Sequence, residues 1–337
     1  MTVETFPTEE EIANIVFAFS ADVYQLSDAI RFLNIIDIAK PNPTRFICWL
    51  IGLKLIPPER VNWIIEIYKL SDYYKRCLTR YCKDCYLDPL NAVTQSGLIR
   101  DTIKEALPWF ESFARAYKLS DYHIQDAELR VQRIFAICMQ DASGFTYNEA
   151  YCRVGFLSYL ISLLFTAKGG LPLVFAEAMG HHIARAIISV LAFNRHLDEI
   201  GGSENHQSEL LRLTKRFAPE VLPKLTEGRI NLFEFTMRWE RNLFADEHSP
   251  LNIFLIWDHI FFHITEFRYF IRFLIVAHLR AMLRANIDFN SDESIYEMKW
   301  DAMGIIDDVE YLMEKDKEKP MKFVYQMFCP CFPSLWK

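Results

Sequence analysis

Glycine is scarce in this sequence, with 11 residues among 337, and long stretches carry no helix breaker at all. Both features favour helices over folds that are made of many short strands. Basic residues do not predominate either, since the formal net charge is −7. A nucleic-acid-binding protein would present a clustered basic face, so we expect no nucleic acid among the partners.

The sequence also lacks the segments that mark export or membrane insertion. Its first residues, up to Glu11, are acidic where a signal peptide would be basic and then apolar. An uncharged run from Val154 to Ala167 has 14 residues. A spanning helix needs ~20, so we predict a buried core helix there. The eight cysteines are expected to be free thiols. We expect a cytoplasmic protein with at most peripheral contact with endomembranes.

What the sequence does contain is helical periodicity around a large apolar fraction of 51%. Thr8 and Glu11 form a capping box ahead of an apolar stripe. Asn231 and Glu234 mark a second helix start, and Ser249-Pro250 places a capping hydroxyl before a proline at the first helical position. No sustained period-2 alternation appears. We therefore predict an all-α fold.

Three clusters raise the question of a metal or an enzyme site. Cys77, Cys82 and Cys85 are not followed by the second cysteine pair that a strong zinc site would show, and His259 and His263 lack the glutamate of a zinc-protease helix. Asp307-Asp308-Val-Glu310 stands alone, whereas prenyl-transfer enzymes need carboxylates on facing helices. We interpret that cluster as a solvated helix face, and we predict no metal or cofactor.

Five motifs, in order, resemble those of the TBC family of Rab GTPase-activating proteins. The segment 45–52, Arg-Phe-Ile-Cys-Trp-Leu-Ile-Gly, is similar to the family's opening arginine, tryptophan and leucine-leucine-glycine. The segment 98–104, Leu-Ile-Arg-Asp-Thr-Ile-Lys, stands where the family has isoleucine, aspartate and arginine at intervals of three. The others are Arg133-Ile-Phe135 with Gly144-Phe-Thr-Tyr147, then Phe217-Ala-Pro219 with Leu222 and Leu225, then Trp239 and Phe244 with Ile256-Trp-Asp258.

This resemblance implies a two-lobed helical domain whose groove receives a GTP-loaded Rab, with a role in vesicle trafficking. In active members an arginine and a glutamine are inserted beside the γ-phosphate. The arginine spreads positive charge over the phosphoryl oxygens, and the glutamine orients the attacking water.

The sequence departs from the family at both finger positions. Lys104 replaces the arginine, so that the charge is kept but the planar, five-donor guanidinium is lost. Tyr147 replaces the glutamine, and a phenol cannot donate and accept across an amide. The next residues, Asn148-Glu-Ala150, differ from the family's glycine-methionine-asparagine as well. We therefore expect a member that binds a Rab without activating it. Asp101 and Lys104 also have the spacing of an ordinary helical ion pair.

The sequence thus predicts an N-terminal helical leader at 1–30, a TBC-like domain at 31–290 with lobes dividing near 199–206, and a C-terminal helix and aromatic tail at 291–337. The expected partner-binding residues are Asp101, Lys104, Gly144, Phe145 and Tyr147, and the expected structural-motif residues are Arg45, Trp49, Gly52, Trp239, Trp257 and Asp258. Two alternatives stay open: an active GTPase-activating protein working through Lys104 or Arg100, and a scaffold that binds other proteins. The tail cysteines Cys329 and Cys331 are a candidate acylation site.

Overall fold

The computed structural model describes residues 5–19, 44–83, 85–91, 93–141, 145–197, 203–289, 295 and 297–328, and it contains helices and no strand within them. The all-α prediction is thereby confirmed. The helices fall into two compact units, one of 1–199 with 238–265 and one of 200–237 with 266–337. The sequence analysis placed a single lobe division near 199–206, whereas the chain passes between these units three times.

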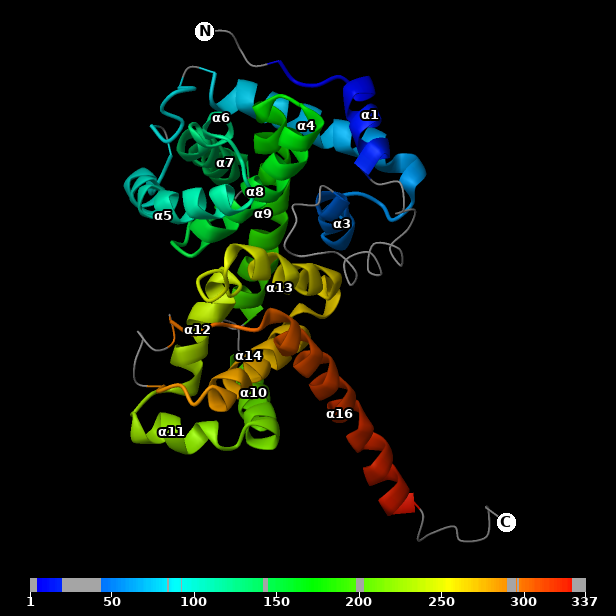
Figure 1. The fold of residues 1–337 in the computed structure, drawn as a ribbon, viewed down its shortest axis with the longest axis vertical. Helices are drawn as coiled ribbons and strands as arrows, with labels where there is room; N and C mark the ends of the chain where they lie inside the picture. The colour runs from blue at the N-terminus through cyan, green and yellow to red at the C-terminus, as the bar shows by residue number, and fades with distance from the viewer. Residues whose placement is uncertain are drawn as a thin grey trace, which may run out of the picture. The chain divides into compact units, whose positions relative to one another are not determined.

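The first unit contains the following helices, given in chain order (Figure 1). They are α1 Glu9–Phe19, α3 Thr44–Gly52, η1 Arg60–Asn62, α4 Trp63–Tyr81, α5 Ser96–Ala116, α6 Asp121–Ile124, α7 Ala127–Asp141, α8 Tyr151–Gly169, α9 Leu173–Leu197 and α13 Pro250–Phe262. Helix α12, Leu232–Asn242, spans the boundary between the units.

The core of the first unit is built on α8 and α9, which lie side by side (Figure 1). The uncharged run predicted as a core helix is buried within α8, as predicted. The two helices approach closely because Gly180 has no side chain: a Cβ there would lie 3.0 Å from the Cα of Tyr159. Within α9, residues 173–193 are long and apolar enough to cross a membrane, and 78% of that window is buried inside the structure, as in a core helix.

The N-terminal helix α1 belongs to the first unit. The capping box is present, because the backbone N–H of Thr8 donates to the Glu11 carboxylate at 2.7 Å and the N–H of Glu11 donates to the Thr8 hydroxyl at 3.3 Å. The apolar side chains of Ile12 and Val16 are fully buried. A Cβ at Gly169 would lie 2.8 Å from the Ile15 side chain, so the end of α8 is shaped to accept α1.

A buried ion pair joins α3 to α13 in the first unit. The guanidinium Nε of Arg45 donates to the Asp258 carboxylate at 3.1 Å, and the indole N–H of Trp49 donates to its other oxygen at 2.5 Å. Burial raises the pKa of Asp258 to about 6, although Arg45 and Trp49 act in the opposite direction. The first and last motifs of the resemblance therefore meet across more than 200 residues.

The second unit consists of α10 Ser203–Phe217, α11 Val221–Glu227, α14 Phe267–Arg284 and α16 Ala302–Phe328, with the 3-10 helix η3, Ile264–Glu266, at its edge. Helix α16 buries one apolar stripe in this unit. The stripe has helical spacing and consists of Ala302, Ile305, Ile306, Val309, Leu312 and Met313.

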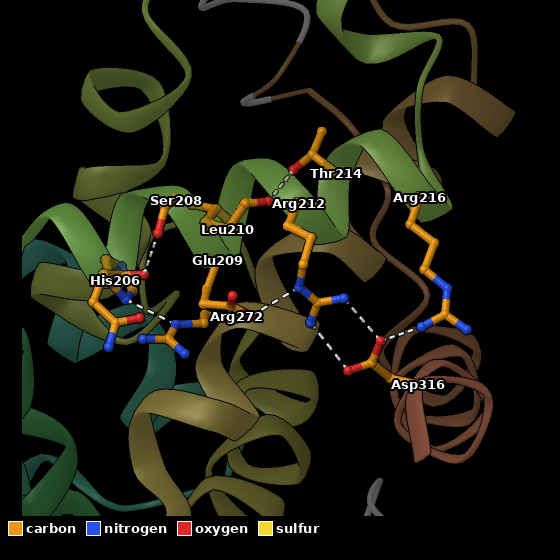
Figure 2. A network of polar contacts seen from close by, with 10 residues as sticks. His206, Ser208, Glu209, Leu210, Arg212, Thr214, Arg216, Arg272 and Asp316 are labelled. Carbon is orange, nitrogen blue, oxygen red and sulfur yellow. Dashed lines mark hydrogen bonds and ion pairs between the residues drawn. The ribbon is translucent and has the colours of Figure 1, made fainter. Parts of the chain in front are cut away.

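Two aspartates fix α16 by pairing with arginines of α10 and α14. Figure 2 shows Asp316 facing Arg212, at 3.0 Å, and Arg216. Asp308 accepts from Arg280 at 2.9 Å and from Arg284 at 3.1 Å, and its side chain is only 10% exposed. The expectation of a solvated face for the cluster around Asp308 is therefore wrong at this residue. The arginines that pair with it lie 24 and 28 residues away, outside the cluster's own helix.

The two other predicted helix starts differ in how they are capped. The side-chain oxygen of Asn231 accepts from the backbone N–H of Phe233 at 2.8 Å, just before α12 begins. Ser249 occupies the N-cap position of α13 and Pro250 its first position, as predicted. The Ser249 hydroxyl, however, makes no capping hydrogen bond.

Candidate functional site

Helix α5 carries Lys104, the first predicted finger position, on an exposed face. Its apolar face is buried through Ile99, Ile103 and Phe110. Asp101 and Lys104 lie on the opposite side and are exposed. Neither side chain forms an ion pair with another described residue, so the predicted helical pair between them is absent. The Lys104 ammonium is therefore free to meet an anionic group.

The Tyr147 side chain, at the second predicted finger position, points inward. The Tyr147 side chain is 3% exposed, and its ring meets that of Phe135 edge-on with centroids 5.0 Å apart. The phenol oxygen lies 2.7 Å from the Thr102 hydroxyl on α5. The Thr102 hydroxyl also lies 2.9 Å from the Leu98 carbonyl, so a phenol that donates to Thr102 leaves the Thr102 proton for that carbonyl. The Tyr147 side chain thus offers no surface to a partner.

Several contacts hold the Tyr147 loop against α5. The backbone N–H of Tyr147 donates to the side-chain oxygen of Gln95 at 3.0 Å, at the start of the helix. The thiol of Cys152 donates to the Thr102 carbonyl at 3.3 Å. Burial raises the pKa of the Tyr147 phenol far from any pH at which it could ionise. Tyr147 is therefore a neutral, structural side chain.

The residues after Tyr147 form a turn of their own. The Asn148 side-chain oxygen accepts from the backbone N–H of Ala150 at 3.0 Å, and the Asn148 carbonyl accepts from the N–H of Tyr151 at 2.9 Å. An asparagine turn of this kind offers the backbone a local alternative to regular structure. The predicted partner residue Phe145 is half-buried, and Gly144 lies outside the described residues.

A second loop, described at residues 85–91 and 93–95, flanks the same face of α5. Asp88 of this loop pairs with Arg100 of α5 at 2.9 Å, and both side chains are about half exposed. Leu87 beside it is 62% exposed, and Leu98 on α5 is 36% exposed. Arg100, Asp101 and Lys104 on one helix, with the two leucines near them, form what we call the finger face.

A buried cluster centred on Glu177 of α9 lies inside the same unit. Its carboxylate accepts from Arg133 at 2.6 Å and from Arg130 at 2.9 Å, and the Tyr74 hydroxyl donates to it at 2.7 Å. These contacts lower the pKa of Glu177 even though burial acts to raise it. Arg133, which belongs to one of the five motifs, thus has a structural role.

The motif residues Gly52, Trp239 and Trp257 are packed in the core of the first unit. The indole N–H of Trp257 donates to the Leu243 carbonyl at 2.9 Å, and the Trp239 ring stacks on Phe244. A Cβ at Gly52 would lie 3.3 Å from the Cβ and carbonyl oxygen of Phe261 on α13, so this glycine permits α3 and α13 to touch. Packing accounts for each of these residues.

The sequence reasoning missed the residues that decide the state of the finger loop. Thr102 stands at a variable position of its motif, and Gln95 precedes the motif altogether. The sequence did contain a signal for such a partner, because the hydroxyl of a buried tyrosine in a loop needs a hydrogen-bond acceptor. No group of three or more potential metal ligands occurs among the described residues, and the cysteine and histidine clusters of the sequence analysis are not brought together as such a group.

These helices in this order define an all-α fold of the TBC type. Among solved structures, the chain is similar to the crystal structure of the Ypt/Rab-GAP domain of Gyp1p, with a TM-score of 0.64. The alignment covers 91% of this chain and 98% of that domain, at 13% sequence identity. The predicted TBC-like fold is thereby confirmed. No protein-family model matches the sequence, and no curated protein matches it either.

Proposed function

We propose that this protein binds a Rab-type GTPase in its GTP-bound form through the finger face and does not accelerate GTP hydrolysis. The fold supports a GTPase partner, since the similar domain is described as a Ypt/Rab-GAP domain. The exposed charges of Asp101 and Lys104 on α5 support the location.

The observation that carries the absence of activation is the burial of Tyr147. A finger acts only if its side chain reaches the phosphate or the attacking water. At the glutamine position the side chain is 3% exposed and its one polar atom is bonded to Thr102. The residue at this position is therefore not an amide that could orient the water, and its side chain points inward.

Lys104 supplies charge without the rest of the arginine's chemistry. Its exposed ammonium can contact one phosphoryl oxygen, which favours binding of an anionic nucleotide face. Binding of this kind is equally strong before and in the transition state, so it raises affinity without raising the rate.

One observation favours a second candidate, an active GTPase-activating protein that uses Arg100. This arginine lies one helical turn before Lys104 and is 46% exposed. Asp88 holds its guanidinium at 2.9 Å, so an active role would require the pair to open. Replacement of Asp88 by alanine would release Arg100 and distinguishes the two candidates.

The test combines binding with single-turnover phosphate release over a panel of Rab proteins. We expect selective binding to at least one GTP-loaded Rab and a hydrolysis rate within about tenfold of the intrinsic rate, whereas a trans finger supplies ~10³ or more. Lys104→Ala should weaken binding, and Lys168→Ala, an exposed lysine at the end of α8, is the matched control.

Each component of the proposal is contradicted by a different result. Equal affinity for GTP- and GDP-loaded Rabs removes the preference for the GTP-bound form. No affinity for either removes the GTPase partner and leaves the scaffold alternative. A thousandfold acceleration that is lost in Arg100→Ala establishes the second candidate instead.

A further inference from the structure

Cys82 and Cys85 form a Cys-x-x-Cys pair directly after α4, which the proposed function does not use. The backbone N–H of Cys85 donates to the carbonyl oxygen of Cys82 at 3.2 Å, which closes a four-residue turn. The end Cα atoms of such a turn lie less than about 7 Å apart. A disulfide needs Cα atoms roughly 4.4–6.8 Å apart. The backbone thus holds the Cα atoms of the two residues within the range that a disulfide allows.

The position of the Cys85 sulfur supports the same pairing. Its Sγ lies 3.5 Å from the carbonyl oxygen of Tyr81, and that peptide group contains the backbone nitrogen of Cys82. Cys85 is also the one cysteine in the described part of the chain that is not buried. The others there are Cys48, Cys77, Cys82, Cys138 and Cys152. Burial raises the pKa of Cys82 to about 12, so Cys85 is the thiol that meets an oxidant first.

We propose that Cys82 and Cys85 are a redox modification site, at which a peroxide joins the two sulfurs in a reversible disulfide. The Cys85 sulfur attacks the O–O bond of hydrogen peroxide, becomes a sulfenic acid, and one water leaves. The Cys82 sulfur then attacks the Cys85 sulfur, so that the S–S bond forms and the S–O bond breaks, with a second water leaving. Two thiols lose two protons and two electrons, which reduce the peroxide. A dithiol reductant reverses the step.

A disulfide at this site would also affect the finger face, because consecutive hydrogen-bonded turns connect Cys85 to it. The N–H of Asp88 donates to the Cys85 carbonyl at 3.0 Å, and the N–H of Asn91 donates to the Asp88 carbonyl at 3.1 Å. Each turn therefore begins at the residue where the previous one ends. A bond that fixes Cys85 also constrains Asp88, which holds Arg100 of α5 at 2.9 Å. The site stands on its own chemistry and does not depend on a GTPase partner.

The experiment uses the full chain with Cys329→Ser and Cys331→Ser, so that the tail thiols do not contribute. Hydrogen peroxide should remove about 2 Da from the intact mass, which is two hydrogen atoms, and dithiothreitol should restore it. Peptide mapping without reduction should join Cys82 to Cys85. Cys85→Ser should abolish the mass loss, and Cys77→Ser, at the other nearby thiol, should not. Hydrogen exchange at the first turns of α5 should change on oxidation.

Several results would overturn the proposal. These are a gain of about 16 or 32 Da without any loss of 2 Da, a disulfide that maps to Cys77, and a mass that peroxide leaves unchanged. If Cys85→Ser does not fold, native alkylation of the parent chain decides, because iodoacetamide must label Cys85 before any buried cysteine. Labelling of another described cysteine first contradicts the assignment.

Discussion

The hydrogen bond between Tyr147 and Thr102 is one of the contacts that hold the Tyr147 loop against α5, and its strength can be measured. Tyr147→Phe keeps the buried ring and removes only the phenol hydroxyl, whose oxygen lies 2.7 Å from the Thr102 hydroxyl. A neutral intramolecular hydrogen bond contributes about 1 kcal/mol net, so the free energy of unfolding should fall by that amount. Tyr147→Gln also loses the ring's packing on Phe135 and should cost roughly 3 kcal/mol.

The assay is urea unfolding followed by far-UV circular dichroism, with Thr102→Val as the second member of a double-mutant cycle. Thr102 and Thr79 both donate to the carbonyl four residues earlier, at 2.9 Å in each case. Thr79→Val is therefore the matched control, since no phenol is bonded to that hydroxyl. We expect a coupling of about 1 kcal/mol between Tyr147→Phe and Thr102→Val. A coupling below roughly 0.3 kcal/mol would refute the contact.

Two further predictions concern buried charge in the first unit. Asp258→Asn should destabilise the protein by about 3–5 kcal/mol in thermal unfolding, because Arg45 would be left buried without a carboxylate; a loss under 1 kcal/mol would contradict a buried pair. Burial raises the pKa of Glu247 to about 7 from 4.5, although Arg238 opposes the change, so the ionised form is disfavoured in the folded state. Stability from this group is present below about pH 4.5 and is lost as the pH rises through 7. The free energy of unfolding of Glu247→Gln, compared with that of the parent protein, should therefore be up to ~3 kcal/mol more favourable at pH 8 than at pH 4. A difference between the two proteins that does not change with pH would refute the pKa shift.

The features predicted correctly from the sequence are those that local chemistry determines. The capping box at Thr8, the cap at Asn231 and the uncharged run within α8 each depend on residues within a few turns of one another. The order of the five motifs gave the fold, because motif residues such as Arg45 and Asp258 are the contacts that hold it together.

The features that could not be predicted depend on partners far away in the sequence. The direction of Tyr147 follows from Thr102, 45 residues earlier, and the burial of Asp308 follows from two arginines on α14. Periodicity reports which face of a helix is apolar, but it does not report which polar group lies opposite a given side chain. The motifs therefore predict finger positions at Lys104 and Tyr147, whereas the direction of the Tyr147 side chain could not be predicted from them.

The burial of Tyr147 also changes what restoring the two fingers should achieve. Lys104→Arg alone should raise the rate of phosphate release by less than about tenfold, because no amide orients the water. Lys104→Arg with Tyr147→Gln supplies both groups, but the glutamine must first leave the position that the buried ring occupied, and the Asn148 turn still directs the backbone that follows. We expect the folded double variant to exceed the sum of the singles and to stay below the ~10³ of a complete trans finger. Circular dichroism must show that the variant is folded before its rate is interpreted. A thousandfold acceleration of phosphate release by the double variant would show that only the two finger side chains had been lost. The same acceleration by Lys104→Arg alone would show that no glutamine is required at position 147.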